Sequence, residues 1–231
     1  MSRISFENYG LKAKQSSSYL HIASRFEFME ESENFIVHDI LEKLKLKKKD
    51  NIIDIGCGAG NITIPLNSFV SHTTCIDHQY CLDRLNSRLD KSKSFKLIPG
   101  NFIDLKIKKT FDKMLCYSVI HYLKDEKEMW DFILKAIYLL KPGGLALFGD
   151  LPNKSKKERF INTKFGKKID SEYQKSLKDI NSNTTDFVNL SKDVELVDLN
   201  DESILRLVKK IRNEGFNAYL LEQPSQLSLS Y

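Results

Sequence analysis

Cysteine is scarce in this chain and follows no paired pattern. None of the four cysteines belongs to a C-x-x-C pair, and the five histidines do not complete the spacing of a zinc site. Most of the cysteines lie in or beside short apolar runs, where reduced thiols in a protein core are expected. We therefore predict no metal site and reduced core cysteines in a cytoplasmic protein; these are Cys57, Cys75, Cys81 and Cys116.

Long hydrophobic runs are also missing. No stretch approaches the roughly 20 apolar residues that a membrane-spanning helix needs. The opening residues, MSRISFENYG, are polar and lack the apolar run of a signal peptide. We expect a soluble intracellular protein with no membrane partner.

The chain has no strong excess of one charge. It carries 36 lysines and arginines against 31 aspartates and glutamates, a net charge of +5 over 231 residues. Dedicated nucleic-acid surfaces usually show a clear basic bias, so this balance does not favour a nucleic-acid partner. The length suits one domain with an added cap. Neither the charge nor the length predicts an oligomeric state.

Short apolar runs alternate with segments of helical periodicity. Such alternation is typical of a parallel sheet covered by helices on both faces, which is a doubly wound α/β fold of the Rossmann type. Two further strands are expected near the end of the chain. The predicted strands are 51–55, 72–76, 95–98, 113–119, 145–148, 218–221 and 226–230, and the predicted helices are 32–49, 62–70, 80–91, 125–140 and one around 204–211.

Two segments fall outside this rhythm. Residues 1–50 precede it and are predicted to form an N-terminal helical cap, which leaves 51–231 as the main domain. Residues 151–195 interrupt it as a polar, basic insertion. Both segments carry aromatic residues, and ligands of such folds bind at the carboxyl edge of the sheet. We expect the two segments to cover that edge, although solvated decoration is the alternative.

The stretch IDIGCGAG, residues 53–60, is the most informative part of the sequence. It follows a predicted strand and opens a predicted helix, and its glycines let the backbone approach a ligand closely. A nicotinamide site would favour G-x-G-x-x-G, but Asn61 stands where the last glycine would fall. Asp54 would repel a pyrophosphate and would attract a ligand with an ammonium group. The loop therefore indicates a cationic ligand.

Two later features join this loop. Asp77 ends the second strand, where an acceptor for ribose hydroxyls is expected, and Leu140–Gly144 reads LKPGG. With these features the sequence resembles the class I S-adenosylmethionine-dependent methyltransferases, well over 51–148 and more loosely beyond. The resemblance implies S-adenosylmethionine as cofactor and a seven-stranded sheet whose last strand is antiparallel.

The resemblance also implies a set of cofactor contacts. Asp54 and the glycine loop would surround the methionine part, Asp77 would hold the ribose, and His78 would lie beside the adenine. Asn101 stands where the family often has an aspartate for the adenine amino group. The implied set is Asp54, Gly56, Cys57, Gly58, Gly60, Asp77, His78, Asn101, Phe102 to pack on the base, and Tyr117 near the sulfonium. Tyr9 and Tyr19 of the cap are weaker candidates for the sulfonium contact, with core packing as the alternative role of all three tyrosines.

The catalytic candidates depend on the methyl acceptor. A hydroxyl must lose its proton, which calls for a positioned base, whereas a neutral amine attacks directly. His121 follows the fourth strand and Asp150 ends the fifth, so both are candidates for a base or an orienting group. Packing is the alternative role for His121.

The acceptor class is constrained by missing motifs. Residues 116–119 read CYSV and lack the N-P-P-Y pattern of base amino methylation, and no cysteine lies next to a proline as cytosine-carbon methylation requires. By analogy with similar chains, we expect a small-molecule acceptor, either a sugar or nucleotide sugar or a related metabolite. The alternatives are an RNA or protein methyltransferase that uses the lysines of 154–178, and a non-catalytic cofactor-binding subunit.

Overall fold

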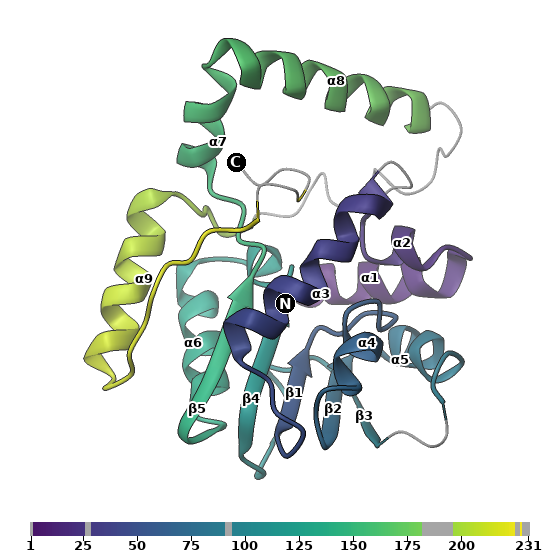
Figure 1. The fold of residues 1–231 in the computed structure, drawn as a ribbon, viewed down its shortest axis with the longest axis vertical. Coiled ribbons are helices and arrows are strands. Elements are labelled where there is room, and N and C mark those ends of the chain that lie inside the picture. The colour runs from purple at the N-terminus through teal and green to yellow at the C-terminus, as the bar shows by residue number, and fades with distance from the viewer. Residues whose placement is uncertain (1, 26–28, 91–93, 182–195, 225–226, 228–231) are drawn as a thin grey trace.

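The computed structural model describes residues 2–25, 29–90, 94–181, 196–224 and 227. Its centre is a parallel sheet of five strands in the order β3-β2-β1-β4-β5 (Figure 1). The strands are β1 (Asn51–Ile55), β2 (His72–Asp77), β3 (Phe95–Pro99), β4 (Phe111–Tyr117) and β5 (Leu140–Gly149). The first five predicted strands and the α/β class are therefore confirmed.

Helices cover both faces of the sheet, and strand alternation decides which residues they meet. Ile52 and Leu115 face α3 (Glu30–Leu44) and α4 (Thr63–Asn67), where Ile40 and Leu66 are fully buried. Ile53, which follows Ile52, and Met114, which precedes Leu115, face α6 (Glu126–Ile137) on the other side. The remaining covering helices are α5 (Gln79–Asn86) and α9 (Asp201–Asn213). All four cysteines are buried and free, as predicted.

The strand order reverses beside β1. The chain runs outward from β1 to β2 and β3, and then returns to place β4 on the other side of β1. The loops that follow β1 and β4 therefore diverge at the carboxyl edge, which opens a crevice between them. This crevice is where a ligand of such a fold is expected.

The N-terminal helices lie over that edge. Helix α1 (Arg3–Gln15) packs on α5, and Arg84 donates hydrogen bonds to the carbonyls of Ala13 at 3.0 Å and Ser16 at 2.9 Å. Helix α2 (Tyr19–Ile22) buries Ile22 against Ala13. Helix α3 behaves differently because it packs on the sheet itself. The division of the chain at residue 50 stays a prediction.

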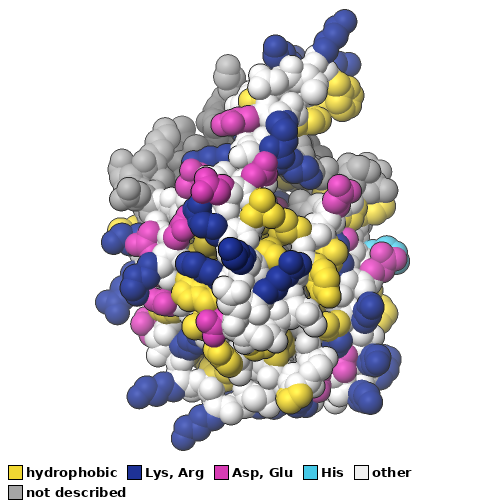
Figure 2. All heavy atoms as spheres, turned by 90° about the vertical axis from the view of Figure 1, so that its left-hand side faces the viewer, with side chains coloured by type: hydrophobic (Ala, Val, Ile, Leu, Met, Phe, Trp, Pro, Cys, Tyr) yellow, Lys and Arg dark blue, Asp and Glu magenta, His cyan; other side chains and the backbone are white. Residues whose placement is uncertain are grey.

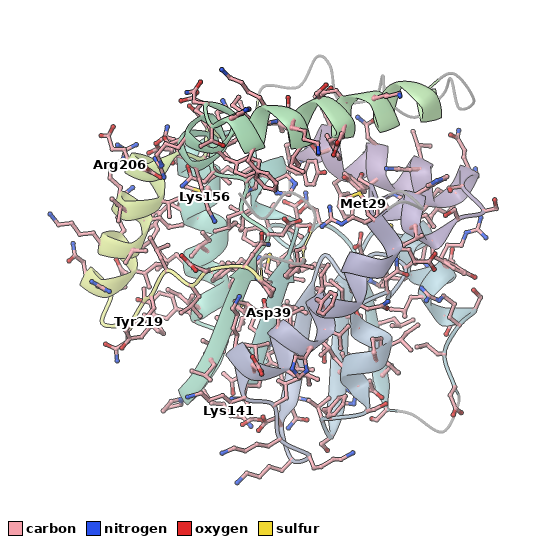
Figure 3. The ribbon with its side chains drawn as sticks, turned by 45° about the horizontal axis from the view of Figure 1, so that its top comes forward. Met29, Asp39, Lys141, Lys156, Arg206 and Tyr219 are labelled. Carbon is pink, nitrogen blue, oxygen red and sulfur yellow. The ribbon has the colours of Figure 1, made fainter. Side chains whose placement is uncertain are left out.

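The basic insertion forms two helices in its described part. They are α7 (Lys154–Ile161) and α8 (Lys164–Asn181), and α8 extends across the carboxyl edge of the sheet (Figures 1 and 3). Burial raises the pKa of Tyr173 on α8, and the charge of Arg25 opposes this rise. The helix therefore reaches close to the N-terminal segment over the crevice. The rest of the predicted insertion, 182–195, lies outside the described residues.

The expectation of seven strands with an antiparallel last strand goes beyond the five parallel strands of the described residues. Residues 218–221 form no strand, so that prediction is wrong. The guanidinium of Arg212 donates two hydrogen bonds to the Ala218 carbonyl, at 2.6 and 3.0 Å, and so occupies a group that a strand pair would need. The predicted strand 226–230 lies outside the described residues except for Leu227, which pairs with no strand.

The LKPGG stretch, which begins where the predicted helix 125–140 was expected to end, is part of a strand. It forms the first half of β5, and the register with β4 shifts between Phe111 and Lys113. Lys141 binds the carboxylate of Asp112 at 2.9 Å, at the end of the sheet opposite the crevice (Figure 3). This motif therefore stabilises the strand pair and does not line the ligand crevice.

The side of the molecule formed by α9 and the 214–224 segment mixes apolar and basic side chains (Figure 2). Tyr219, Leu220 and Leu221 are exposed there. Among the described residues, no helix is both long enough and apolar enough to cross a bilayer.

Candidate active site

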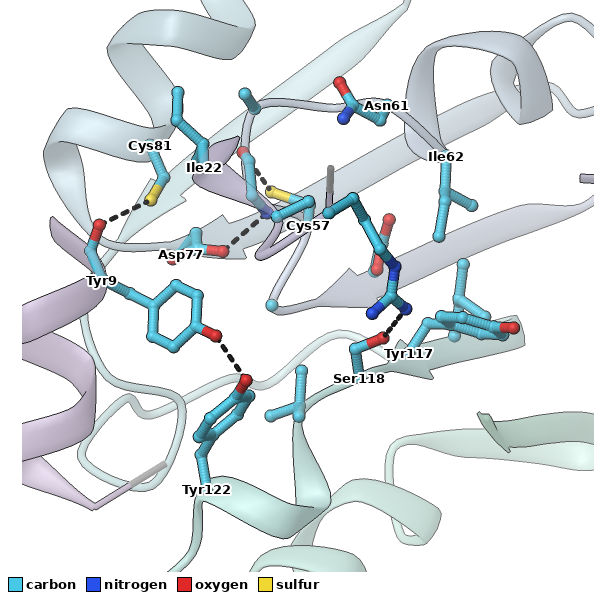
Figure 4. A pocket seen from close by; sticks show the side chains of 18 of the residues that line it. Tyr9, Ile22, Cys57, Asn61, Ile62, Asp77, Cys81, Tyr117, Ser118 and Tyr122 are labelled. Atoms are coloured by element: carbon cyan, nitrogen blue, oxygen red, sulfur yellow. Dashed lines mark hydrogen bonds between the residues drawn. The ribbon is translucent and has the colours of Figure 1, made fainter. Parts of the chain in front are cut away.

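A pocket opens at the carboxyl edge of the sheet, where the strand order reverses (Figure 4). The space between its walls, together with its opening to solvent, amounts to about 860 Å³. The loop after β1 forms one wall, and residues after β4 together with the N-terminal segment form the other. The side chains that matter below are Tyr9, Arg25, Asp54, Cys57, Asp77, Tyr117, Ser118, His121 and Tyr122.

The glycine loop lines the first wall with backbone. Gly58 has φ of +55°, and a Cβ added there would meet nothing within 4 Å, so the space beside it belongs to the pocket. Gly60 differs, because its added Cβ would lie 2.3 Å from Leu85 of α5. One glycine therefore serves ligand approach and the other serves helix packing.

Asp54 lies at the floor of the pocket and is 3% exposed. Burial raises its pKa to about 7, while a hydrogen bond from Thr63 at 2.5 Å opposes the rise and the nearby Asp77 adds to it. No cation pairs with Asp54 among the ion pairs of the described residues. A cationic ligand would therefore relieve the cost of ionising this carboxyl.

Asp77 joins the loop to the end of β2. Its carboxylate accepts hydrogen bonds from the backbone N–H of Gly58 at 2.7 Å and of His78 at 2.6 Å (Figure 4). Burial raises the pKa of Asp77, and these two hydrogen bonds act against that rise. Each oxygen keeps a lone pair for a further donor, which suits a ligand hydroxyl.

A smaller cavity of about 260 Å³ adjoins the pocket through the shared residues Gly56, Asp77 and Val119. Asn101 and Phe102 line this cavity, so the structure brings both predicted residues to the site. Phe102 is 3% exposed and packs edge-on against Phe132 at 4.9 Å between ring centroids. The lining of this cavity is largely apolar, and Asn101 and Asp77 are its polar side chains.

His78 and Cys57 differ in their relation to the pocket. His78 does not line either cavity; its Nδ1 accepts from the Tyr80 N–H at 3.2 Å, and its ring packs on Phe6 at 5.1 Å. Cys57 does line the pocket, and burial raises the pKa of its thiol well above the usual value. The thiol therefore stays protonated and is no nucleophile.

The opposite wall is built from side chains at and after the end of β4, together with the N-terminal segment. Tyr117 lines the pocket, and its hydroxyl receives a hydrogen bond from Gln223 at 3.4 Å. His121 lines the pocket as well. Burial lowers its pKa to about 4, and its buried Nδ1 has no hydrogen-bond partner among the described residues. The ring is therefore neutral at pH 7 and offers an unoccupied acceptor.

Asp150 is not among the pocket-lining residues. Its carboxylate pairs with Arg25 at 2.6 Å and accepts a short hydrogen bond from Ser118, which also binds Arg25 at 3.0 Å. Burial alone would raise the pKa of Asp150, but Arg25 and Ser118 hold it below its usual value. Ser118 and Asp150 both have left-handed backbones, with φ of 58° and 55°. Two residues with strained backbones thus hold Arg25 at the pocket.

Residues 53–148 match the protein family described as a methyltransferase domain. This part of the chain therefore carries a methyltransferase domain, and the chain resembles S-adenosylmethionine-dependent methyltransferases in sequence and in fold. The family predicted from the glycine motif is confirmed, and with it the cofactor that gives the family its name.

Three relatives of this methyltransferase illustrate the range of likeness. "Ubiquinone biosynthesis O-methyltransferase" of Rickettsia typhi is 24% identical over 223 residues, which cover 94% of this chain and 86% of that protein. "Nodulation protein S" of Rhizobium tropici is 28% identical over 100 residues, 43% of this chain and 42% of that protein. The crystal structure of N-methyltransferase NodS from Bradyrhizobium japonicum WM9 with S-adenosyl-L-homocysteine is 20% identical, with a TM-score of 0.54 over 62% of this chain and 71% of that one. The last likeness shows the fold.

Sequence reasoning missed part of the methyltransferase pocket. It did not single out Arg25 or Ser118, and it gave Tyr9 and Tyr19 as weaker candidates for the sulfonium contact. Tyr9 lines the pocket, whereas Tyr19 lies outside the lining with the guanidinium of Arg88 4.1 Å from its ring centre. The aromatic residues of the cap were the one available signal, because nothing local marks Arg25.

Proposed function

We propose that this methyltransferase transfers the methyl group of S-adenosylmethionine to a small molecule, either a sugar or a related metabolite, at a hydroxyl or amine. The observation that carries the proposal is the two-sided pocket. One wall offers glycine backbone and buried carboxylates, and the other offers His121 and a held guanidinium. The relatives named as O-methyltransferase and N-methyltransferase support the same reading.

The cofactor half fits S-adenosylmethionine, which supplies a methyl group already activated on a sulfonium. Gly58 leaves open space for close approach, and Asp54 offers a buried carboxyl for the ammonium group. Asp77 is placed to accept from the ribose hydroxyls, and Asn101 and Phe102 line the cavity for the adenine. Tyr117 turns its ring toward the pocket, where a cationic centre is favoured.

The acceptor half orients the nucleophile and excludes water. His121 would accept a hydrogen bond from the acceptor at Nδ1, because that nitrogen is buried and otherwise unpaired. Arg25 would hold a polar group of the acceptor, and Asp150 with Ser118 fixes the guanidinium in place. Asp150 therefore acts through Arg25 in this proposal, since its carboxylate is engaged by Arg25 and Ser118.

The lysine-rich helices give little support to an RNA acceptor. Lys154 pairs with Asp198 at 2.6 Å, Arg159 pairs with Asp201 at 2.5 Å, and Lys168 pairs with Glu172 at 3.8 Å. Carboxylates therefore offset part of the positive charge that phosphate groups would need. A non-catalytic subunit would have no use for the strained Arg25 arrangement.

A label-partition assay tests the proposal. The protein is incubated with methyl-labelled S-adenosylmethionine and a bacterial lysate, and small molecules are separated from RNA and protein. We expect the label in the small-molecule pool, where mass spectrometry then identifies the acceptor. Label in RNA or protein contradicts the small-molecule proposal, and tight cofactor binding without any transfer supports the non-catalytic subunit. Arg206→Met, a surface change distant in sequence from every residue lining the pocket, serves as a matched variant that should label like the wild type.

A further inference from the structure

The proton of a hydroxyl acceptor has no obvious destination among the pocket residues already assigned. His121 has a pKa of about 4, so it holds a proton poorly near neutral pH. Asp150 is paired with Arg25, which makes its carboxylate a still weaker base. A base that works near neutral pH has a pKa close to the working pH. Neither predicted candidate meets this condition.

A chain of hydrogen bonds leads away from the same pocket through two tyrosines. The Tyr9 hydroxyl donates a short hydrogen bond to the Tyr122 hydroxyl, and both residues line the pocket (Figure 4). The Tyr9 hydroxyl also bonds the Ser24 hydroxyl at 2.7 Å. Lys12 Nζ donates to the same Ser24 hydroxyl at 2.8 Å. Four residues thus form one continuous path from the pocket to an amine.

Several features hold this path in place. Ser24 has a left-handed backbone, with φ of 56°, although it is not a glycine. Such strain is kept where the position of a side chain matters. The rings of Tyr9 and Tyr122 meet edge to face, with centroids 4.9 Å apart. Lys12 Nζ lies 5.5 Å from the centre of the Tyr9 ring.

The charges around Lys12 suit a proton acceptor. Lys12 forms no ion pair among the described residues, and its hydrogen-bond partner is a neutral hydroxyl. Burial lowers its pKa to about 8, and the charge of Arg25 lowers it further. The titratable or charged groups that face it are Tyr9 on its own helix and Arg25 after α2, and Tyr122 is reached through Tyr9. Tyr173 on α8 faces Arg25 in turn.

We infer that Tyr122, Tyr9, Ser24 and Lys12 form a proton relay that carries the hydroxyl proton of the acceptor away from the pocket. This inference rests on the proposed function and narrows its acceptor to a hydroxyl, because a neutral amine attacks without prior loss of a proton. Tyr122 touches the acceptor, and Lys12 acts through the chain as the terminal proton acceptor.

The transfer balances in atoms and charge. The acceptor oxygen forms a bond to the methyl carbon as the carbon–sulfur bond breaks, and the bonding pair stays on sulfur. The acceptor hydroxyl gives its proton to the Tyr122 oxygen, Tyr122 gives its own to Tyr9, Tyr9 to Ser24, and Ser24 to the neutral amine of Lys12. Lys12 ends as an ammonium, and the hydrogen bonds then run outward from Lys12 to Tyr122, as they do in the structure.

The test separates proton transfer from structural support. Lys12→Arg keeps a cation and a donor for Ser24 but cannot be deprotonated near neutral pH. Lys14→Arg on the same helix is the matched control, because Lys14 is exposed and lies over the ring of Tyr80. The probe is the small-molecule fraction of a bacterial lysate with methyl-labelled S-adenosylmethionine. The rate of transfer is followed from about pH 6.5 to about pH 9.5, and cofactor affinity is measured in parallel.

The wild type and the control should gain rate as the pH rises through about 8, where Lys12 becomes neutral. Lys12→Arg should lose this rise and fall at least about tenfold below wild type at the upper end, with unchanged cofactor affinity. Tyr9→Phe, which interrupts the path in its middle, should do the same. A Lys12→Arg profile that matches the wild type overturns the relay.

A second measurement needs no acceptor. When Lys12 loses its proton, the hydrogen bonds along the path reverse, so the ring carbons bearing the Tyr9 and Tyr122 hydroxyls should shift in NMR spectra. The shift should share the midpoint of Lys12 and vanish in Ser24→Ala. If the tyrosine signals do not change as Lys12 titrates, the relay is overturned, whatever the labelling assay gives. If the wild type labels no small molecule, that result contradicts the proposed function and leaves the relay to be judged by the NMR titration.

Discussion

The two halves of the pocket are built by opposite means. The cofactor half comes from loops that follow neighbouring strands, and its key contact joins Gly58 to Asp77, 19 residues apart. The acceptor half joins Arg25 to Ser118 and Asp150, 93 and 125 residues apart, and Tyr9 to Tyr122, 113 apart. The first half uses backbone and buried carboxylates, whereas the second uses charged and hydroxyl side chains. Binding of the common cofactor and choice of the acceptor are thereby separated within one pocket.

Strain is distributed unequally between these halves. The cofactor half meets its left-handed positions with glycine, as at Gly58. The acceptor half places Ser24, Ser118 and Asp150 in the same backbone region, each at some energetic cost. A surrounding structure that tolerates this cost must gain from the position of each side chain. The comparison predicts that substitutions in the two halves will separate turnover from cofactor affinity.

The largest effect is expected for Arg25→Met. Turnover should fall about 100-fold, because a fixed charge at the acceptor is lost, while cofactor affinity should change less than about threefold. The variant also leaves the partly buried Asp150 carboxylate unpaired and should lower the melting temperature. Arg25→Met with Asp150→Asn should recover the melting temperature but not the turnover. Recovered turnover would mean that Arg25 only neutralises Asp150.

Asp54 should make the stability of the ligand-free protein depend on pH. Its pKa of about 7 lies above the ordinary 3.8, so the folded state binds more protons than the unfolded state between these values. Stability is therefore lost as the pH rises through this window and is lowest above about 7. The melting temperature of Asp54→Asn relative to wild type should rise by several degrees from about pH 4 to about pH 8. If the melting temperatures of the two proteins change with pH in parallel, the pKa of Asp54 is not raised in the folded state.

Gly58→Ala and Gly143→Ala form a matched pair for the cofactor half. Both glycines have left-handed backbones, with φ of +55° and +76°, and neither has an atom within 4 Å of an added Cβ. Each substitution should cost about 1 kcal/mol of stability. Only Gly58→Ala should weaken S-adenosylmethionine binding, by about tenfold in a calorimetric titration. Equal affinities in the two variants would mean that the cofactor does not approach Gly58 closely.

The smallest effect is expected for Arg206→Met, the same chemical change as Arg25→Met at the surface. Arg206 pairs with Glu126 and Glu202 at 2.6 Å, but its side chain is 45% exposed. Such pairs contribute about 0.2–1 kcal/mol. The melting temperature should change by no more than about 4 °C, and turnover should stay at the wild-type value. A large loss of turnover would show that removing a charge far from the pocket also impairs catalysis. The effect of Arg25→Met could then not be assigned to the acceptor half.

The sequence carried enough information for the sheet and for most of the cofactor half. Asp54, Gly58 and Asp77 belong to contiguous stretches whose period and turn residues are local signals. His78 caps the N-terminus of α5 and packs on Phe6, so its place beside the adenine stays a prediction.

The acceptor half could not be predicted in the same way. Arg25 follows a helix of four residues and meets partners from two distant strand ends, so no local period reveals it. The sequence does not distinguish Lys12 from other lysines on solvated helices, because its neighbours Ser24 and Arg25 are brought to it only by the tertiary structure. The expected strand at 218–221 failed for a related reason, since Arg212 captures the Ala218 carbonyl through side-chain contacts that a strand pattern ignores.

The segment that ends near Gln223 has a consequence for how such chains diversify. Gln223 reaches both the Tyr117 hydroxyl and the Asp150 carboxylate, while Lys43 of α3 holds the Glu222 carbonyl at 2.6 Å. Arg25, which precedes the sheet in sequence, and Gln223, which follows it, thus converge on Asp150. Exchanging such segments between genes could alter the acceptor while the glycine loop and its strands were inherited unchanged.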